Sequence, residues 1–203
     1  MQSRRIVAID YGGGNIGSLV GALRRRGIEP IVTDDRDAVL QADAAFFPGD
    51  GAFVATMDAL RERRLDSAIY ERIERGRPYF GICVGMQVLF EGSSEFGGAR
   101  GLGIFRGEVG RFEGDVRLPH MGWNRLEPSH AHPVLRELGE EEYAYFLHSY
   151  RALPGVDCIA TATHGERFAA VVARGAAVGT QFHPEKSQRT GEKILDAFLA
   201  SLD

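Results

Sequence analysis

Short apolar runs alternate with segments of helical periodicity through the first half of the chain. Strands are predicted at residues 6–10, 30–33, 44–47 and 77–82. Helices are predicted at residues 18–26 and 53–75, with a break in the second one near Arg64. Strand, turn and helix in this repeated order are typical of a doubly wound, mostly parallel sheet in an α/β fold. Ligands bind at the carboxyl ends of the strands in such sheets, so residues directly after the strands are candidates for function.

The pattern changes in the second half, where glycines interrupt the apolar runs and the helical segments stop. Antiparallel strands are predicted around residues 104–105 and 108–109, where they would cover part of the cleft. Later elements are predicted as strands at 143–150, 158–163, 168–173 and 177–182 and an amphipathic helix at 190–202. The strands 158–163 and 168–173 resemble a hairpin. The chain has no linker, repeat or low-complexity stretch, so we expect a single domain over residues 1–203.

Composition and charge argue against several classes of function and partner. The chain has 203 residues, 44% of them hydrophobic, and a formal net charge of -4 at pH 7. This balance argues against nucleic acid or an anionic membrane as partner. The apolar run near the N-terminus is too short for a signal peptide and no stretch reaches membrane-spanning length, so we expect a cytoplasmic protein. Of the two cysteines, Cys158 lies in an apolar run and is interpreted as inert core.

The glycine-rich segment 11–15 follows the first predicted strand and allows two interpretations. It could be a phosphate-binding loop or a tight strand-to-helix turn. Its spacing matches neither the dinucleotide fingerprint nor the P-loop, and no Lys-Ser or Lys-Thr pair follows it. These observations favour the turn.

Cys83 is the strongest candidate for chemistry. It stands in Gly81-Ile82-Cys83-Val84-Gly85-Met86-Gln87, where an apolar strand runs into a predicted helix. A side chain on such a sharp turn stands clear of the sheet, and the backbone N–H of Val84 could donate to an oxyanion. The start of the helix would favour a thiolate. A cysteine between glycines is also compatible with a small buried core residue, so a catalytic interpretation requires a base.

His183 is the best candidate for that base. It ends a predicted strand and is followed by Pro184 and Glu185, whose carboxylate could accept a hydrogen bond from one ring nitrogen. A strand-end histidine beside a surface glutamate is the alternative, but the elbow cysteine in the same type of sheet favours a triad. The other histidines have no cysteine or carboxylate at metal-ligand spacing, so neither a metal nor another cofactor is expected. The residues predict covalent acyl chemistry through a thioester and leave the acyl group open.

The segments around Cys83 and His183 resemble the nucleophile and His-Glu blocks of the class I glutamine amidotransferases, over essentially the whole chain. Residues 118–124 and 146–150 are similar to the glutaminase subunits of imidazole glycerol phosphate synthases of histidine biosynthesis. The resemblance implies the flavodoxin-like amidotransferase fold and an enzyme that hydrolyses glutamine to glutamate and ammonia. It also implies a heterodimer with a (β/α)8-barrel cyclase, which uses the ammonia to form imidazole glycerol phosphate and aminoimidazole carboxamide ribotide.

The resemblance also assigns roles by position. It implies that Cys83 attacks the side-chain amide of glutamine, His183 protonates the departing ammonia and Glu185 orients His183. The backbone N–H groups of Val84 and Asp50 would form the oxyanion hole. The residues expected to bind glutamine are Gly51, Gln87, Glu95, His148, Ser149 and Tyr150. The candidates for the partner-facing surface are Asn15, Trp123, Tyr145 and Lys186, for which a turn residue, core aromatics and a solvated lysine remain alternatives.

Asp50 departs from the family pattern, which usually has a small apolar residue at this position. A backbone N–H donor tolerates a changed side chain. A carboxylate that pointed inward would oppose the developing oxyanion. We therefore expect the Asp50 side chain to point to solvent or to the partner.

Three alternatives remain open at this point. A flavodoxin-like redox or stress protein would oxidise its elbow cysteine, but such proteins lack a late His-Pro-Glu segment. A non-catalytic scaffold would be expected to have lost Cys83 or His183. A glutaminase subunit of another biosynthetic amidotransferase would differ at residues 119–124.

Overall fold

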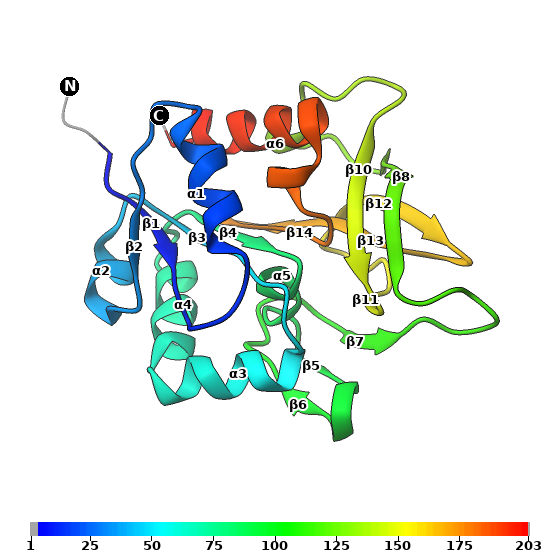
Figure 1. Cartoon of the computed structure of the whole chain (residues 1–203), viewed down its shortest axis with the longest axis horizontal. Coiled ribbons are helices and arrows are strands. Elements are labelled where there is room, and N and C mark those ends of the chain that lie inside the picture. The colour runs from blue at the N-terminus through cyan, green and yellow to red at the C-terminus, as the bar shows by residue number, and fades with distance from the viewer. Residues whose placement is uncertain (1–3, 203) are drawn as a thin grey trace.

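The computed structural model describes residues 4–202, and an eight-stranded mixed sheet lies at its centre (Figure 1). The strand order is β2–β1–β3–β4–β14–β13–β12–β9. The parallel part contains β2 (Ile31–Thr33), β1 (Ile6–Ile9), β3 (Ala44–Phe47), β4 (Tyr79–Ile82) and β14 (Ala177–Thr180). The antiparallel part adds β13 (Glu166–Arg174), β12 (Cys158–His164) and β9 (Glu127–Pro128). The predicted α/β fold with a mostly parallel sheet and an antiparallel section is confirmed.

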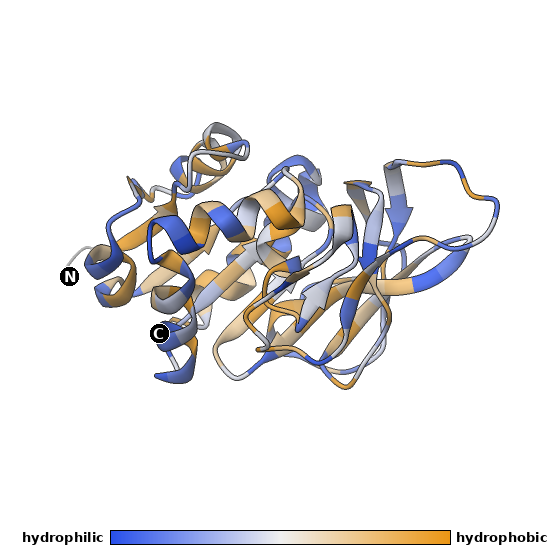
Figure 2. Cartoon of the chain, turned by 90° about the horizontal axis from the view of Figure 1, so that it is seen from below, coloured by the Kyte–Doolittle hydropathy of each residue, from blue (hydrophilic) through white to orange (hydrophobic). Residues whose placement is uncertain are grey.

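Helices cover both faces of the sheet. One face packs against α1 (Ile16–Arg24) and α6 (Gln188–Ala200). The other face packs against α2 (Arg36–Gln41), α3 (Phe53–Glu62), α4 (Leu65–Glu74) and α5 (Val84–Gln87). Arg64 adopts a left-handed backbone with φ 56° between α3 and α4, which confirms the predicted break in that helical segment. Figure 2 shows hydrophobic and hydrophilic bands along these helices, as expected for helices with one face on a core.

The central strands are buried on both faces because helices cover both. In β1, Val7 and Ile9 contact the side of α2 to α5, whereas Ile6 and Ala8 contact the side of α1 and α6. This period of two explains why the first strand is a continuous apolar run. Full burial of each valine or isoleucine side chain stabilises the fold by about 1.5–3 kcal/mol.

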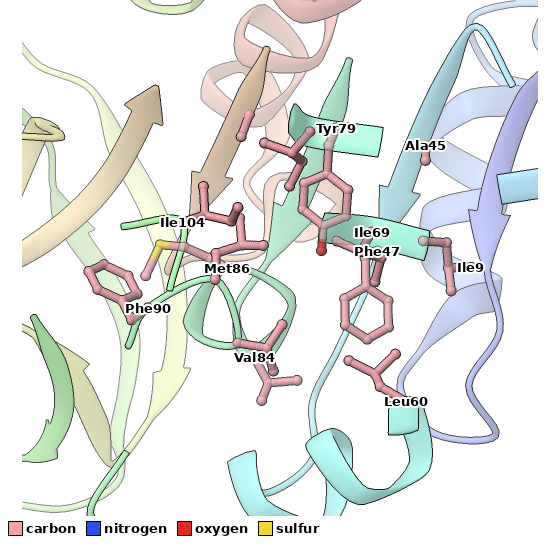
Figure 3. Packing of buried hydrophobic residues seen from close by; sticks show 14 of the residues in the cluster. Ile9, Ala45, Phe47, Leu60, Ile69, Tyr79, Val84, Met86, Phe90 and Ile104 are labelled. Atoms are coloured by element: carbon pink, nitrogen blue, oxygen red, sulfur yellow. The ribbon is translucent and has the colours of Figure 1, made fainter. Parts of the chain in front are cut away.

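Aromatic packing connects the sheet to the elbow after β4. Figure 3 shows Phe47 between Tyr79 and Leu60, with Val84 beside them. The Tyr79 hydroxyl donates a hydrogen bond to the carbonyl oxygen of Gly85 at 3.0 Å. The buried ring of Tyr79 thus fixes the first turn of α5 against β4, on which it stands.

Two smaller sheets lie beside the main one. The first is the antiparallel pair of β8 (His120–Arg125) and β10 (Tyr143–His148), which lie side by side in Figure 1. The second contains β11 (Tyr150–Ala152), β7 (Glu108–Arg111), β5 (Gly92–Ser93) and β6 (Ala99–Arg100). The 3-10 helices are η1 (Glu95–Gly97), η2 (Pro133–Leu135) and η3 (Pro184–Lys186). The Asn124 side chain donates to the carbonyl oxygen of Thr163 at 2.7 Å and attaches β8 to β12.

The structure corrects several predicted elements. Residues 104–105 form no strand, because the N–H of Phe105 donates to Leu89 in the segment after α5 instead of to a neighbouring strand. The pairing of β5 with β7 is parallel, although an antiparallel arrangement was expected there. The predicted strand 143–150 is interrupted at Ser149, and the short helix α2 was not anticipated.

Candidate active site

The nucleophile elbow is a strained turn between β4 and α5. Cys83 has φ 53° and ψ −112°, a conformation that non-glycine residues seldom adopt. Its glycine neighbours allow close backbone approach. A Cβ at Gly81 would lie 2.3 Å from the carbonyl oxygen of Gly85, and one at Gly85 would lie 2.1 Å from that of Phe47. The sequence therefore places the thiol at the end of a buried strand, where only glycine fits on either side.

The turn that follows β3 packs directly on the elbow. A Cβ at Gly49 would lie 2.0 Å from Cγ1 of Val84, so only a glycine lets the two turns meet. The backbone N–H groups of Asp50 and Gly51 make no hydrogen bond to the backbone of the described residues. Val84 is the first residue of α5, a position at which the N–H has no partner inside the helix. Free backbone donors are therefore available beside Cys83 from two elements.

Asp50 is exposed at the mouth of the pocket that contains Cys83. Among the described residues its carboxylate has no ion pair or hydrogen bond, and the hydrogen-bond partners of the Cys83 sulfur are Leu147 and Gln181. Because Asp50 is exposed and also lines the pocket, the outward direction of its carboxylate stays a prediction.

His183 and Glu185 form a buried pair. Nδ1 of His183 lies 2.8 Å from Oε1 of Glu185, and the two side chains are 3% and 2% exposed. The carboxylate fixes the proton of the neutral ring on Nδ1, which leaves Nε2 for the substrate side. Nε2 is buried and has no hydrogen-bond partner among the described residues.

Cys83 and Glu185 together control the charge of His183. Burial lowers the pKa of His183, but the interactions with the Cys83 thiol and the Glu185 carboxylate outweigh it and raise that pKa above its ordinary value of 6.5. The imidazolium is therefore favoured at neutral pH. A protonated ring next to the sulfur can donate a proton to a leaving group.

The turn that carries His183 is held by β10 and α6. The N–H of His183 donates to the carbonyl oxygen of Tyr145 at 3.0 Å, and the Ser187 hydroxyl donates to the carbonyl oxygen of His183 at 2.7 Å. The Ser187 oxygen in turn accepts from the N–H of Tyr145 at 2.9 Å. A Cβ at Gly191 would lie 1.9 Å from the carbonyl oxygen of Pro184, so α6 reaches this turn only through a glycine.

A cavity of about 280 Å³ opens beside Cys83. Its lining includes the residues that were expected to bind glutamine: Gly51, Gln87, Glu95, His148, Ser149 and Tyr150. The structure therefore brings together the whole predicted set, which comes from four separate parts of the sequence. Glu95 has a second contact, because its Oε2 accepts the N–H of Phe53 at the start of α3 at 2.6 Å.

Two contacts of the Cys83 sulfur were missed by sequence reasoning. The Gln181 side chain donates from Nε2 to Sγ at 3.6 Å, and the carbonyl oxygen of Leu147 lies 3.9 Å from Sγ. A signal for Gln181 exists in the sequence, because a residue two positions before His183 on an extended segment lies on the same side. No comparable signal exists for the Leu147 carbonyl, since a backbone acceptor leaves no mark on residue type.

The candidate partner-facing residues lie on neighbouring elements. Trp123 of β8 and Tyr145 of β10 are cross-strand partners whose ring centroids are 6.1 Å apart, and Trp123 is 48% exposed. Lys186 is on η3, which contacts both β10 and α1. Asn15 is exposed and also caps α1, because its Oδ1 accepts the N–H of Ser18 at 3.2 Å. The glycine-rich segment before it acts here as a strand-to-helix turn.

The sequence is similar to known proteins over nearly its full length. A model of the family "Glutamine amidotransferase class-I" matches residues 7–202. The chain is 44% identical over 201 residues to imidazole glycerol phosphate synthase subunit HisH of Salinibacter ruber, an alignment that covers 95% of this chain and 92% of that protein. The chain belongs to the class I glutamine amidotransferases, in the HisH family. This membership confirms the resemblance inferred from the two motif segments and decides against a redox protein.

Two further comparisons agree with this membership in sequence and in fold. It is 40% identical over 200 residues to the chloroplastic imidazole glycerol phosphate synthase hisHF of Arabidopsis thaliana, covering 96% of this chain and 34% of that protein. Among solved structures, PurLQS from Thermotoga maritima has a TM-score of 0.78 at 21% identity and covers both chains fully, which shows the shared fold. The identities of 40% and more to imidazole glycerol phosphate synthase subunits favour this branch over the amidotransferases of other pathways.

Residues 4–202 contain no group of three or more His, Cys, Asp or Glu side chains that could hold a metal ion. Within the same range, no helix combines the length and the apolar character needed to cross a membrane.

Proposed function

We propose that this class I amidotransferase hydrolyses L-glutamine to glutamate and ammonia with Cys83 as nucleophile, His183 as acid and base, and Glu185 as the group that orients His183. The observation that carries the proposal is the convergence of the strained elbow, the buried His183–Glu185 pair and the free backbone donors on one cavity. The HisH relatives support glutamine as the substrate.

The first half-reaction forms a thioester. The Cys83 sulfur attacks the side-chain carbonyl carbon of glutamine, and the carbonyl electrons move to the oxygen. The N–H groups of Val84 and Asp50 stabilise that oxyanion, each donor of this type contributing about 10²- to 10³-fold to the rate. When the oxyanion collapses, the C–N bond breaks and Nε2 of His183 gives its proton to the nitrogen, which leaves as ammonia.

The second half-reaction uses the same histidine as a base. Acylation removes the charge on sulfur, which is one of the two interactions that raise the pKa of His183. The imidazole is then neutral and can accept a proton from water at Nε2. The resulting hydroxide adds to the thioester carbon, the C–S bond breaks, and glutamate is released with the thiolate restored.

The cavity supports recognition of the free amino acid. Glu95 would accept hydrogen bonds from the α-ammonium group, while Gly51 and residues 148–150 would contact the rest of the backbone end of glutamine. Gln87 can use only its carbonyl oxygen for the substrate, because its Nε2 already donates to Tyr150 and Gln181 at 3.0 Å.

We further propose that the ammonia is delivered to a cyclase subunit, which is supported by relatives named as a subunit of imidazole glycerol phosphate synthase. A (β/α)8-barrel would dock on the surface formed by Asn15, Trp123, Tyr145 and Lys186, in a heterodimer. There the ammonia would be added to a phosphoribulosyl-formimino carboxamide nucleotide, giving imidazole glycerol phosphate and aminoimidazole carboxamide ribotide. The fusion named hisHF in Arabidopsis thaliana supports the proximity of the two activities.

A glutaminase assay tests this function. The chain is assayed alone and mixed with the cyclase subunit and its nucleotide, with Cys83→Ala and Cys158→Ala as paired variants. We expect stimulation by the cyclase, a loss of at least about 10³-fold for Cys83→Ala, and little change for Cys158→Ala, whose thiol is buried outside the site. Activity that survives in Cys83→Ala would refute the mechanism, and full activity without the cyclase would refute the regulated subunit.

A further inference from the structure

The carbonyl oxygen of Tyr150 is the centre of a buried hydrogen-bond network beside the active site. It accepts from Nε2 of Gln87 at 3.0 Å and from Nδ1 of His148 at 2.8 Å. A carbonyl oxygen can only accept, so both neighbours must be donors at these atoms. The Tyr150 carbonyl therefore fixes the orientation of the Gln87 amide and the tautomer of the His148 ring.

Gln181 connects this network to the nucleophile, and its amide orientation is fixed in the same way. Since Nε2 of Gln87 faces Tyr150, the same nitrogen donates to Gln181 at 3.0 Å, and the acceptor there must be Oε1 of Gln181. The amide of Gln181 is thereby fixed with its Nε2 toward Sγ of Cys83, at 3.6 Å. Gln181 is 0% exposed, so no water competes for this donor.

We propose that Gln181 is a functional residue of this enzyme: its side-chain N–H stabilises the thiolate of Cys83, and Gln87 and the Tyr150 carbonyl hold it in the donating orientation. The inference rests on the proposed function of Cys83. It adds a neutral donor to the positive charge of His183, which also interacts with Cys83. The carbonyl of Leu147, 3.9 Å from Sγ, suits the thiol form, whereas the amide N–H of Gln181 suits the thiolate.

Other charged and titratable groups surround the same sulfur. His183 and Tyr11 have pKa values that respond to Cys83, while Asp50, Glu95 and His148 line the cavity. A substitution at Gln181 leaves all of these groups in place. A change in the pH dependence of Cys83 reactivity in such a variant therefore reports on the lost donor.

The test is the pH profile of Cys83 alkylation by iodoacetamide, followed by mass spectrometry of the Cys83 peptide in the full-length chain. Gln181→Met keeps the length of the side chain and removes the donor. The midpoint of the pH profile of Cys83 alkylation should therefore rise by about one pH unit in this variant. Gln181→Glu places a negative charge near sulfur and should raise the midpoint further. For Gln181→Met, kcat for glutamine at pH 7 should fall about tenfold, with KM changed less than about twofold, because the donor contacts sulfur and not the substrate.

Thr180→Val is the matched control. Thr180 is also 0% exposed, and its hydroxyl donates to the carbonyl oxygen of Phe182 at 3.0 Å, away from sulfur. This variant should lose stability and keep the alkylation midpoint. An unchanged midpoint in Gln181→Met, or an equal shift in Thr180→Val, would overturn the inference. If Gln181→Met does not fold, the midpoint of Gln181→Glu decides.

The same experiment separates this inference from the proposed function. If Cys83→Ala abolishes glutaminase activity while Gln181→Met keeps the wild-type midpoint, only the role of Gln181 is wrong. If Cys83→Ala remains active, the nucleophile itself is wrongly assigned, whatever the alkylation profiles show.

Discussion

At the scale of single residues, the charge of His183 depends on its interactions with Cys83 and Glu185. Burial alone would make the imidazole neutral, and the two acidic neighbours reverse this effect and raise its pKa. A thiolate at Cys83 therefore favours the protonated ring, and acylation of the sulfur would remove that contribution while Glu185 keeps its own. A change in the covalent state of Cys83 thus shifts the pKa of His183 in the direction that a base requires.

Glu185→Gln tests this electrostatic role. The amide cannot supply a negative charge, so the pKa of His183 falls. His183 donates its proton only below that pKa, and the alkaline limb of the kcat profile should therefore move to lower pH. We expect kcat to fall about 10²- to 10⁴-fold at neutral pH, with KM for glutamine much less affected. The measurement is steady-state glutaminase activity from pH 6 to 10 in the presence of the cyclase.

A variant of a neighbouring surface carboxylate provides the control for that experiment. Glu192→Gln on α6 removes a charge at an exposed position and should leave both kcat and its pH profile unchanged. An alkaline limb that stays in place in Glu185→Gln would contradict the assigned role of Glu185.

At the scale of elements, glycines decide how closely the functional turns approach one another. Gly49, Gly81, Gly85 and Gly191 each stand where a Cβ would lie within 2.3 Å of another atom. Three of them position the elbow and the turn after β3 that is proposed to bind the oxyanion, and Gly191 positions the turn of His183. The arrangement of the site is therefore a packing property of these glycines as much as of the catalytic side chains.

Gly191→Ala tests this packing. The added methyl group would lie against the carbonyl of Pro184 and push α6 away from the turn of His183 and Glu185. We expect a loss of about 1–3 kcal/mol in the free energy of unfolding, together with a lower kcat. The matched control is Gly21→Ala inside α1, where the nearest atom to a Cβ is 3.7 Å away. The free energy of unfolding of that variant should rise by about 0.5–1 kcal/mol because of helix propensity. Urea unfolding of both variants measures the two changes, which should have opposite signs.

The elements also show what the sequence could predict. Residues 44–47 and 177–182 were predicted as strands because central parallel strands are apolar on both faces, and the second strand ends at Thr180 in the structure. The elbow cysteine and His183 could be identified because both follow such strands. The short helix α2 was missed because six residues carry too little periodicity, and it starts from an Asp35 cap that also suits a turn. Gln181 was missed because its role depends on Gln87 and Tyr150, which are remote in the sequence.

The inner face of the β8–β10 pair carries buried histidines that should make stability depend on pH. Burial, and then the charge of His164, lowers the pKa of His120 to about 4. Burial is also the largest cause for His148, whose pKa is lowered to about 3. Nδ1 of His120 lies 3.0 Å from Nε2 of His148 and donates to it in the neutral pair, because Nδ1 of His148 donates to the carbonyl oxygen of Tyr150.

The folded and unfolded states take up protons on these histidines at different pH values. Unfolded histidines titrate near pH 6.5, so between about pH 6.5 and 4 both residues take up a proton only on unfolding. Stability should therefore fall as the pH decreases through this window, by up to about 2.7 kcal/mol per pH unit for two groups. In His120→Gln the slope should decrease by about 1.4 kcal/mol per unit, whereas the exposed His130→Gln should keep it. Urea midpoints at pH 7.5, 6.0 and 5.0 measure the slopes, and an equal slope in all three proteins would contradict this account.

At the scale of the whole molecule, the β8–β10 pair connects the proposed partner surface to the catalytic residues. Its outer face carries Trp123 and Tyr145, and its inner face carries His120 and His148. The backbone of Tyr145 bonds to His183 and Ser187, and the carbonyl of Leu147 faces Cys83. A partner that presses on this small sheet would therefore act on the position of both the acid and the nucleophile.

Trp123→Ala tests whether this face binds the cyclase. Met121, Trp123 and Tyr143 are 62%, 48% and 47% exposed on neighbouring strands, an apolar group that a partner would cover. A large aromatic residue at the centre of an interface contributes about 2 kcal/mol or more, so Kd for the cyclase should rise about 30-fold or more. The stimulated glutaminase activity should then require correspondingly more cyclase, while the activity of the isolated chain stays the same.

Tyr70→Ala is the control, because Tyr70 is 45% exposed on α4 and outside this surface. Equal Kd values for the two variants would place the cyclase on another face, and the connection from β10 to His183 would then lose its regulatory meaning.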